Sequence, residues 1–133
     1  MSLRLSDLPS HVLAITGKAR AKRKYNNEPT LLDGLRFDSR AEAKRYGELR
    51  LMERAGAITD LQRQVPFELV PACKRPGGGT ERPVVYLADF VYHEGPTGQR
   101  VVEDVKGAMT PEYRLKRKLM LWRWGVEIRE IRA

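Results

Sequence analysis

The sequence contains very little cysteine and histidine. Among its 133 residues, Cys73 is the one cysteine, and His11 and His93 are the two histidines. A single cysteine excludes an internal disulfide, and these three residues cannot supply the four ligands of a Cys/His zinc site. We therefore expect a cytoplasmic protein without a structural zinc ion.

Long apolar runs are also missing. No stretch approaches the roughly 20 residues that cross a bilayer, and the start, Met1 to Thr16, is broken by charged residues and Pro9, unlike a signal peptide. The glycines Gly77 to Gly79 lack the Lys-Ser or Lys-Thr of a phosphate-binding loop, and no internal repeat is evident. These absences exclude a membrane-spanning protein, a repeat protein and a P-loop enzyme.

Negative charge is in short supply. The chain has 25 Lys and Arg against 17 Asp and Glu, a formal net charge of +8 and a pI of about 9.9. A basic surface concentrates phosphates, so we expect a polyanionic partner. Residues 1–30 are predicted to form a basic, partly flexible arm, and residues 31–133 one domain. The basic residues of the arm that we expect to contact nucleic acid are Lys18, Arg20, Lys22, Arg23 and Lys24.

Two apolar segments each contain an acid. Asp89 lies within Tyr86 to Tyr92, and Asp104 and Lys106 lie within Val101 to Gly107. The residues between the two segments are rich in turn formers, so the pair is predicted to form a β-hairpin. Because side chains alternate along a strand, Asp104 and Lys106 share one face. With Asp89 across the hairpin, two carboxylates would converge on a cation, and oxygen ligands suit Mg²⁺ or Mn²⁺.

These acids have a structural interpretation as well. Asp89 and Asp104 could pair with Lys106 or a nearby arginine as an ion cluster, because such clusters also occur in sheets. Asp89 is flanked by apolar residues without a local partner, however, and the desolvation cost of such an acid is most often tolerated at functional sites. The combination favours a functional site.

An amphipathic helix is predicted upstream, from Phe37 to about Ala55. Glu42, Tyr46 and Leu49 follow i, i+4, i+7 spacing, so Glu42 shares the stripe that packs on the sheet and is directed toward the hairpin acids. Ser39 and Glu42 also have the spacing of a capping box, in which Glu42 would reach back to the helix start. Both interpretations of Glu42 stay open at this point.

A second helix is predicted to start at Thr110-Pro111-Glu112, which combines a capping residue, proline and an acid. Leu115, Leu119 and Trp122 are expected to form its buried stripe. Its basic flank is expected to contact nucleic acid. These basic residues are Arg114, Lys116, Arg117 and Lys118. Further strands are predicted at Ile58 to Val70 and Val126 to Ile131, with a long loop at Pro71 to Pro83.

Three of these segments resemble the PD-(D/E)xK nuclease superfamily, in particular its phage-associated, Holliday-junction-resolvase-like branch, which includes an uncharacterised family frequent in phage genomes. The resemblance covers residues 31–133. Its elements are Phe37-x-Ser-x-x-Glu-Ala43, an apolar strand with Asp89 before Phe90, and Val102-Glu-Asp-Val-Lys-Gly107. Ala88 stands where the superfamily motif has proline, a variation that the superfamily tolerates.

The resemblance implies an α/β fold: a single domain with a mixed central β-sheet flanked by helices, and a restriction-endonuclease-like αβββαβ core. It also implies a Mg²⁺-dependent or Mn²⁺-dependent DNA endonuclease, encoded by a bacterial host or a phage and acting on branched or phage-derived DNA as a homodimer. Asp89, Asp104 and the backbone carbonyl of Val105 would hold the metal, Glu42 would support it, and Lys106 would orient the attacking water or stabilise charge.

Two other functions stay open from the sequence. One is a catalytically silent nucleic-acid-binding accessory protein, in which the same fold is kept and the acids only stabilise it. The other is an RNA-cutting nuclease with the same chemistry, because phosphodiester hydrolysis does not reveal the sugar.

Overall fold

The computed structural model describes residues 30–32 and 34–133. Residues 1–29 of the predicted basic arm therefore lie outside the described residues, and they include Lys18, Arg20, Lys22, Arg23 and Lys24, whereas Thr30 belongs to the first described strand. Within the described residues, no helix combines the length and the apolar character needed to cross a membrane.

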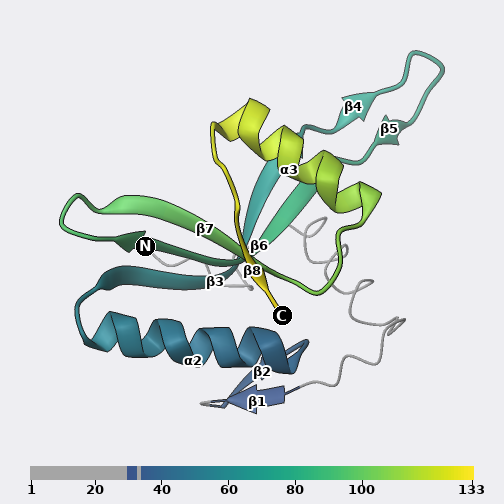
Figure 1. Cartoon of the computed structure of the whole chain (residues 1–133). Helices are drawn as coiled ribbons and strands as arrows, with labels where there is room; N and C mark the ends of the chain where they lie inside the picture. The colour runs from purple at the N-terminus through teal and green to yellow at the C-terminus, as the bar shows by residue number, and fades with distance from the viewer. Residues whose placement is uncertain (1–29, 33) are drawn as a thin grey trace.

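A mixed four-stranded sheet forms the centre of the molecule (Figure 1). Its strands, in spatial order, are β3 (Ile58–Val70), β6 (Val84–Glu94), β7 (Gln99–Lys106) and β8 (Arg129–Arg132). The first three pair antiparallel, whereas β8 lies parallel to β7. A parallel neighbour requires a crossover connection, and the second helix provides it.

The predicted β6–β7 hairpin is confirmed. The two strands pair from Phe90↔Glu103 to Glu94↔Gln99. Gly95 and Gly98 in the connecting turn have φ of 68° and 66°, values that glycine reaches without steric cost. The hairpin brings the two acid-bearing segments side by side.

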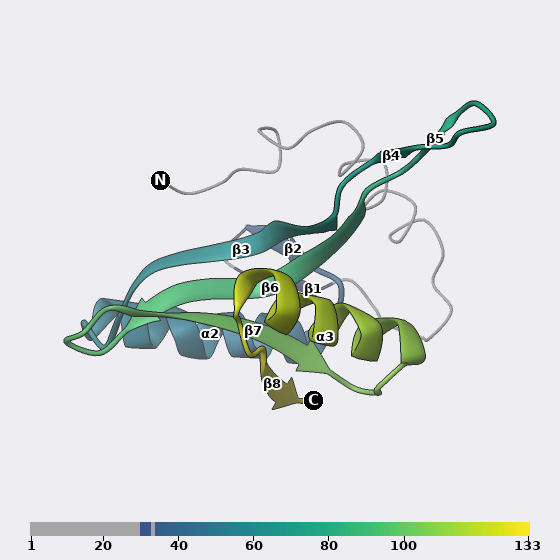
Figure 2. The same ribbon diagram turned by 90° about the horizontal axis from the view of Figure 1, so that it is seen from above.

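The two long helices cover opposite faces of the sheet (Figures 1 and 2). Helix α2 (Arg40–Arg54) packs through Tyr46 and Leu49 in a core that includes Val101, whereas α3 (Pro111–Trp124) packs in a core that includes Val102. Neighbouring residues on a strand point to opposite faces, so the two cores lie on either side of β7. The order α2, β3, β6, β7, α3, β8 is the expected one, and the α/β fold with a mixed, helix-flanked sheet is confirmed.

The prediction of which side of α3 is buried is wrong. Leu115 and Trp122 are 59% and 76% exposed, and Leu119 is only partly buried. The helix contacts the sheet through Tyr113 and Met120 instead. Apolar residues lie on both sides of this helix, so their spacing alone could not identify the side that faces the sheet.

Smaller differences concern the connections. The Pro71 to Pro83 segment was expected to be a loop, but it contains a short hairpin, β4 (Cys73–Lys74) and β5 (Thr80–Glu81), that projects from the body (Figure 2). Another short hairpin, β1 (Thr30–Leu32) with β2 (Leu35–Phe37), precedes α2. The last strand begins at Arg129, three residues later than predicted, because pairing with β7 starts only at Glu103↔Arg129.

Candidate functional site

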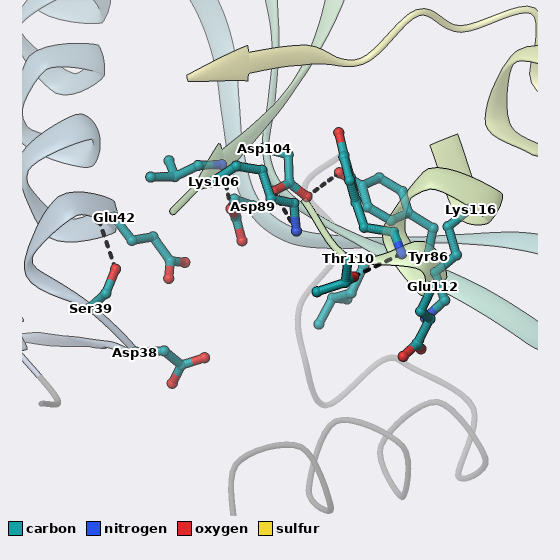
Figure 3. Close-up of a pocket in the computed structure, with 13 residues that line it drawn as sticks. Asp38, Ser39, Glu42, Tyr86, Asp89, Asp104, Lys106, Thr110, Glu112 and Lys116 are labelled. Carbon is teal, nitrogen blue, oxygen red and sulfur yellow. Dashed lines mark hydrogen bonds and ion pairs between the residues drawn. The ribbon is translucent and has the colours of Figure 1, made fainter. Parts of the chain in front are cut away.

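A pocket of about 370 Å³ opens where the first turns of α2 and α3 approach β6 and β7 (Figure 3). Its lining is mostly polar, and acidic side chains outnumber lysines five to two. The acids are Asp38, Glu42, Asp89, Asp104 and Glu112, and the lysines are Lys106 and Lys116. All four residues that the sequence analysis proposed as catalytic therefore line one pocket, and so does Val105.

Glu42 lies in the first turn of α2. Its backbone N–H donates to the Oγ of Ser39 at 3.1 Å, so Ser39 is the helix cap. The Glu42 side chain is buried, and its Oε1 accepts a hydrogen bond from Nε2 of Gln64 at 2.9 Å. The carboxylate is directed at the pocket (Figure 3). Ser39 therefore caps the helix as the capping box predicts. The Glu42 carboxylate accepts from Gln64 and not from the backbone at the helix start.

Asp89 lies where β6 and β7 separate. The last paired residues are Phe90↔Glu103, and just beyond them the backbone N–H of Val105 donates to Oδ2 of Asp89 at 2.8 Å. The aspartate side chain thus replaces a backbone acceptor. This hydrogen bond ties the first acid of the motif to the centre of the Asp104-Val105-Lys106 element.

Strand β6 changes its buried face at Asp89. Tyr86 and Ala88 belong to the core on the α3 side, whereas Phe90 and Tyr92 belong to the core on the α2 side. Residues two apart on a regular strand share a face, so the alternation is interrupted between these pairs. The acid occupies the interruption and not a regular core position.

Gln64 lies opposite this interruption on β3. Its neighbours Arg63 and Val65 pair with Phe90 and Ala88, and Gln64 itself has φ of 52°. Positive φ is uncommon for a residue other than glycine and often accompanies functional sites. The sequence analysis missed Gln64, because a glutamine within a strand carries no signal that it will turn toward a carboxylate.

Asp104 is held from two sides. The Tyr86 hydroxyl donates to its Oδ2 at 2.5 Å, and the Lys106 ammonium lies 3.1 Å from its Oδ1. Lys106 also lies over the Tyr113 ring, 4.0 Å from the centroid, a cation–π contact. Oδ1 is buried, and the Lys106 ammonium is its charged partner. The predicted shared face of Asp104 and Lys106 is confirmed.

Burial is the main cause of a raised pKa in all three carboxylates. Burial raises the pKa of Glu42 to about 7, with a further increase from Asp38. Burial also raises the pKa of Asp89 well above its usual value, and the charges of Glu42 and Asp104 act in the same direction. Burial raises the pKa of Asp104, while Tyr86 and Lys106 oppose the shift. Simultaneous ionisation is therefore costly without an additional cation.

The donor atoms fit a hard divalent cation. Asp89, Asp104, the Val105 carbonyl and Glu42 offer only oxygen, the ligand that Mg²⁺ and Mn²⁺ prefer. Asp104 Oδ1 is buried beside a single ammonium, that of Lys106 at 3.1 Å. As the side chains stand, no three acidic, histidine or cysteine residues in the described ranges are grouped closely enough to hold an ion. Asp89 is bonded to Val105 and Asp104 to Tyr86 and Lys106.

The basic residues of α3 separate into two groups. Lys116 lines the pocket and pairs with Glu112 at 3.2 Å. Arg114, Arg117 and Lys118 are exposed outside the pocket lining, and Arg117 pairs with Glu130 at 3.0 Å. The structure therefore brings one of these four residues to the acids and leaves three on the helix surface.

Comparison of the sequence with protein-family models gives a match over residues 22–132, to the model described as "Protein of unknown function (DUF1064)". The matched range contains every residue that lines the pocket. The comparison with curated proteins and the comparison with solved structures give no match.

Proposed function

Because this chain belongs to the DUF1064 family, whose description names no activity, we propose a function from the pocket itself. The protein is a divalent-cation-dependent endonuclease that hydrolyses phosphodiester bonds in DNA. The observation that carries the proposal is the convergence of Glu42, Asp89, Asp104 and Lys106, from α2, β6 and β7, on one pocket. Their resemblance to the PD-(D/E)xK nucleases supports the same activity.

The distribution of charge supports a cation as part of this site. The whole chain has a formal charge of +8, whereas acids outnumber lysines in the pocket. A basic exterior attracts a polyanion, but a phosphate would be repelled by the acids once it arrived. A divalent cation among the acids removes that repulsion, and the raised pKa values of Glu42 and Asp89 show that the acids alone lack sufficient compensation.

Asp89, Asp104 and the Val105 carbonyl would hold Mg²⁺ or Mn²⁺, with Glu42 beside them. When bound, the ion would supply Lewis-acid chemistry, which lowers the pKa of water and neutralises charge on phosphate oxygens. Tyr86 donates to one oxygen of Asp104 and so orients the other. Asp89, bonded to the Val105 N–H, keeps the two strands in register at the point where they separate.

Lys106 would supply positive charge from a side chain, in addition to the charge of the cation. Its ammonium is fixed between Asp104 and the Tyr113 ring, so it need not reorganise as charge develops on the phosphate. Lys116, at the edge of the pocket, is placed to contact a neighbouring phosphate. These two lysines have separate tasks, transition-state stabilisation and substrate positioning.

The test is a cleavage assay of the full chain with Mg²⁺ on supercoiled DNA, branched DNA and structured RNA. We expect nicking of DNA that EDTA abolishes and that Asp104→Ala abolishes while DNA binding is retained. The matched control is Glu127→Ala, because Glu127 is an exposed acid outside the pocket lining. This variant should cleave DNA normally. Undiminished cleavage by Asp104→Ala would remove this aspartate from the mechanism, and cleavage confined to RNA would reassign the substrate.

A second function, a nucleic-acid-binding module without catalysis, is favoured by one observation. Asp89 and Asp104 both have partners within the protein, as expected for acids that only stabilise the fold. Under this alternative, wild type and Asp104→Ala bind DNA alike and neither cleaves it.

The resemblance extends our proposal to a homodimer that acts on branched DNA, since two symmetric strands require two cuts. Light scattering of the protein with and without a four-way DNA junction measures its oligomeric state. A monomer in both states would refute this extension and leave the chemistry of the single site untouched.

A further inference from the structure

A buried ion pair links α2 to β7, the two elements that supply Glu42 and Asp104 to the pocket. The guanidinium of Arg45 on α2 donates to both carboxylate oxygens of Glu103 on β7, from Nε at 2.8 Å and from Nη2 at 2.7 Å. Glu103 is 0% exposed, and the Arg45 side chain is 15% exposed. The Tyr92 hydroxyl donates to Glu103 as well. Glu103 is thus an acid with a full set of donors, in contrast to the acids of the pocket.

The position of this pair relates it to every acid of the proposed cation site. Arg45 lies one helical turn after Glu42 on α2. Glu103 immediately precedes Asp104 on β7, and its cross-strand partner Phe90 immediately follows Asp89. The pair therefore links α2 to β7 within one residue or one helical turn of Glu42 and Asp104, and Glu103 is paired in the sheet with the neighbour of Asp89.

Stability alone does not explain such a pair. Removing two charges from water is costly, and well-packed apolar residues often serve a buried position equally well or better. A two-point guanidinium–carboxylate contact does, however, specify both distance and orientation. Apolar side chains would allow α2 to shift or rotate on the sheet, and Glu42 would move with it.

We propose that the Arg45–Glu103 pair is a positioning device that holds α2 against β7, so that Glu42 and Asp104 face the same divalent cation. The inference rests on the proposed function, because it presumes a cation among the acids. Neither Arg45 nor Glu103 lines the pocket. Both act through the residues that they position.

The decisive experiment measures Mn²⁺ affinity by electron paramagnetic resonance and thermal unfolding without metal, both on the full chain. The main variant replaces the pair with apolar residues and removes the hydroxyl that would lose its acceptor: Arg45→Met, Glu103→Leu and Tyr92→Phe together. We expect a melting temperature close to that of the wild type and a Mn²⁺ dissociation constant raised about 10- to 100-fold, the usual effect of losing residues that orient metal ligands. A purely structural pair would change the melting temperature and leave Mn²⁺ affinity unaltered in the folded protein.

A milder variant covers the case in which the triple variant does not fold. Arg45→Lys keeps the charge and loses the two-point geometry, so we expect a folded protein whose Mn²⁺ dissociation constant rises roughly threefold or more. Glu94→Gln is the matched control. The Glu94 carboxylate also accepts two hydrogen bonds from one guanidinium, that of Arg129 on the same sheet, and Glu94 lies outside the pocket lining. The substitution removes the charge of this carboxylate. This variant should bind Mn²⁺ as the wild type does.

The outcomes separate this inference from the proposed function. If the wild type binds Mn²⁺ and the folded Arg45 variants bind it equally well, the positioning role is overturned and the cation site stands. If the wild type binds no Mn²⁺, the cation site and the positioning role are both overturned. Weaker binding in the Arg45 variants with normal binding in Glu94→Gln supports the inference.

Discussion

The backbone N–H of Val105 donates a hydrogen bond to the carboxylate of Asp89 across 2.8 Å, at the point where β6 and β7 stop pairing. The two halves of the acidic motif, 16 residues apart in sequence, are therefore joined by a contact in which one half supplies the backbone and the other the side chain. The Asp89 carboxylate accepts this backbone hydrogen bond, and we propose that it also binds the cation. Substitutions can separate the structural role from the chemical one.

Asp89→Asn and Asp89→Ala should separate the two tasks. The asparagine oxygen can still accept from Val105, so we expect near-normal stability but a cleavage rate at least about a hundredfold lower, because the negative charge is lost. Alanine also leaves the Val105 N–H unpaired, at a cost of about 1–3 kcal/mol. Urea unfolding and plasmid nicking measure the two effects. Equal stability of both variants would contradict the structural task.

The stability of the metal-free protein should fall as pH rises. The folded-state pKa of Glu42 is raised from 4.5 to about 7, so between these values the folded state binds more protons than the unfolded state and loses stability with increasing pH. Full ionisation of Glu42 costs up to about 3 kcal/mol. Urea unfolding in EDTA at pH 5 and pH 7.5 measures this loss, and Glu42→Gln should reduce it.

Other pocket acids contribute to the same pH effect. Burial raises the pKa of Asp89 and of Asp104 as well, so Glu42→Gln is expected to retain part of the decline. Excess Mg²⁺ should flatten the curve of the wild type. An identical pH dependence in the wild type and in Glu42→Gln would show that Glu42 ionises freely in the folded protein.

Two substitutions test which side of α3 faces the sheet. Met120 is fully buried, so Met120→Ala should lower the free energy of unfolding by about 2–5 kcal/mol. Trp122 is largely exposed, so Trp122→Ala should change it by no more than about 0.5 kcal/mol. Chemical denaturation of both variants gives the comparison. The reverse order would restore the helix face predicted from the sequence.

Deleting residues 1–30 should weaken DNA binding mainly at low salt. Five of the deleted residues form the cluster from Lys18 to Lys24, and each phosphate contact contributes about 0.9 to the slope of log affinity against log salt on duplex DNA. The slope should therefore fall by up to about 4.5. Fluorescence anisotropy at several salt concentrations measures it. A slope that does not change would exclude the cluster from phosphate contact.

Much of the fold could be predicted from local patterns. Alternating apolar residues and a glycine-rich turn identify the β6–β7 hairpin, and Thr110-Pro111 identifies the start of α3, where Thr110 caps the helix at 3.1 Å. Such signals depend on neighbours in the chain, which a sequence displays directly. The buried side of α3 depends on a choice between two apolar sides that only packing on the sheet makes, and there the prediction failed.

The candidate site shows the same division. By itself, the sequence determined that Asp104 and Lys106 share a face, that Glu103 takes the other, and that Glu42 belongs to the packing stripe of α2, because these relations follow from the periods of strand and helix. Only the tertiary structure decided that Gln64 turns to Glu42, that Tyr86 donates to Asp104, and that Arg45 grips Glu103. These contacts join residues 18 to 58 positions apart, and no local period specifies which distant side chains will meet once the strands twist and the helices dock.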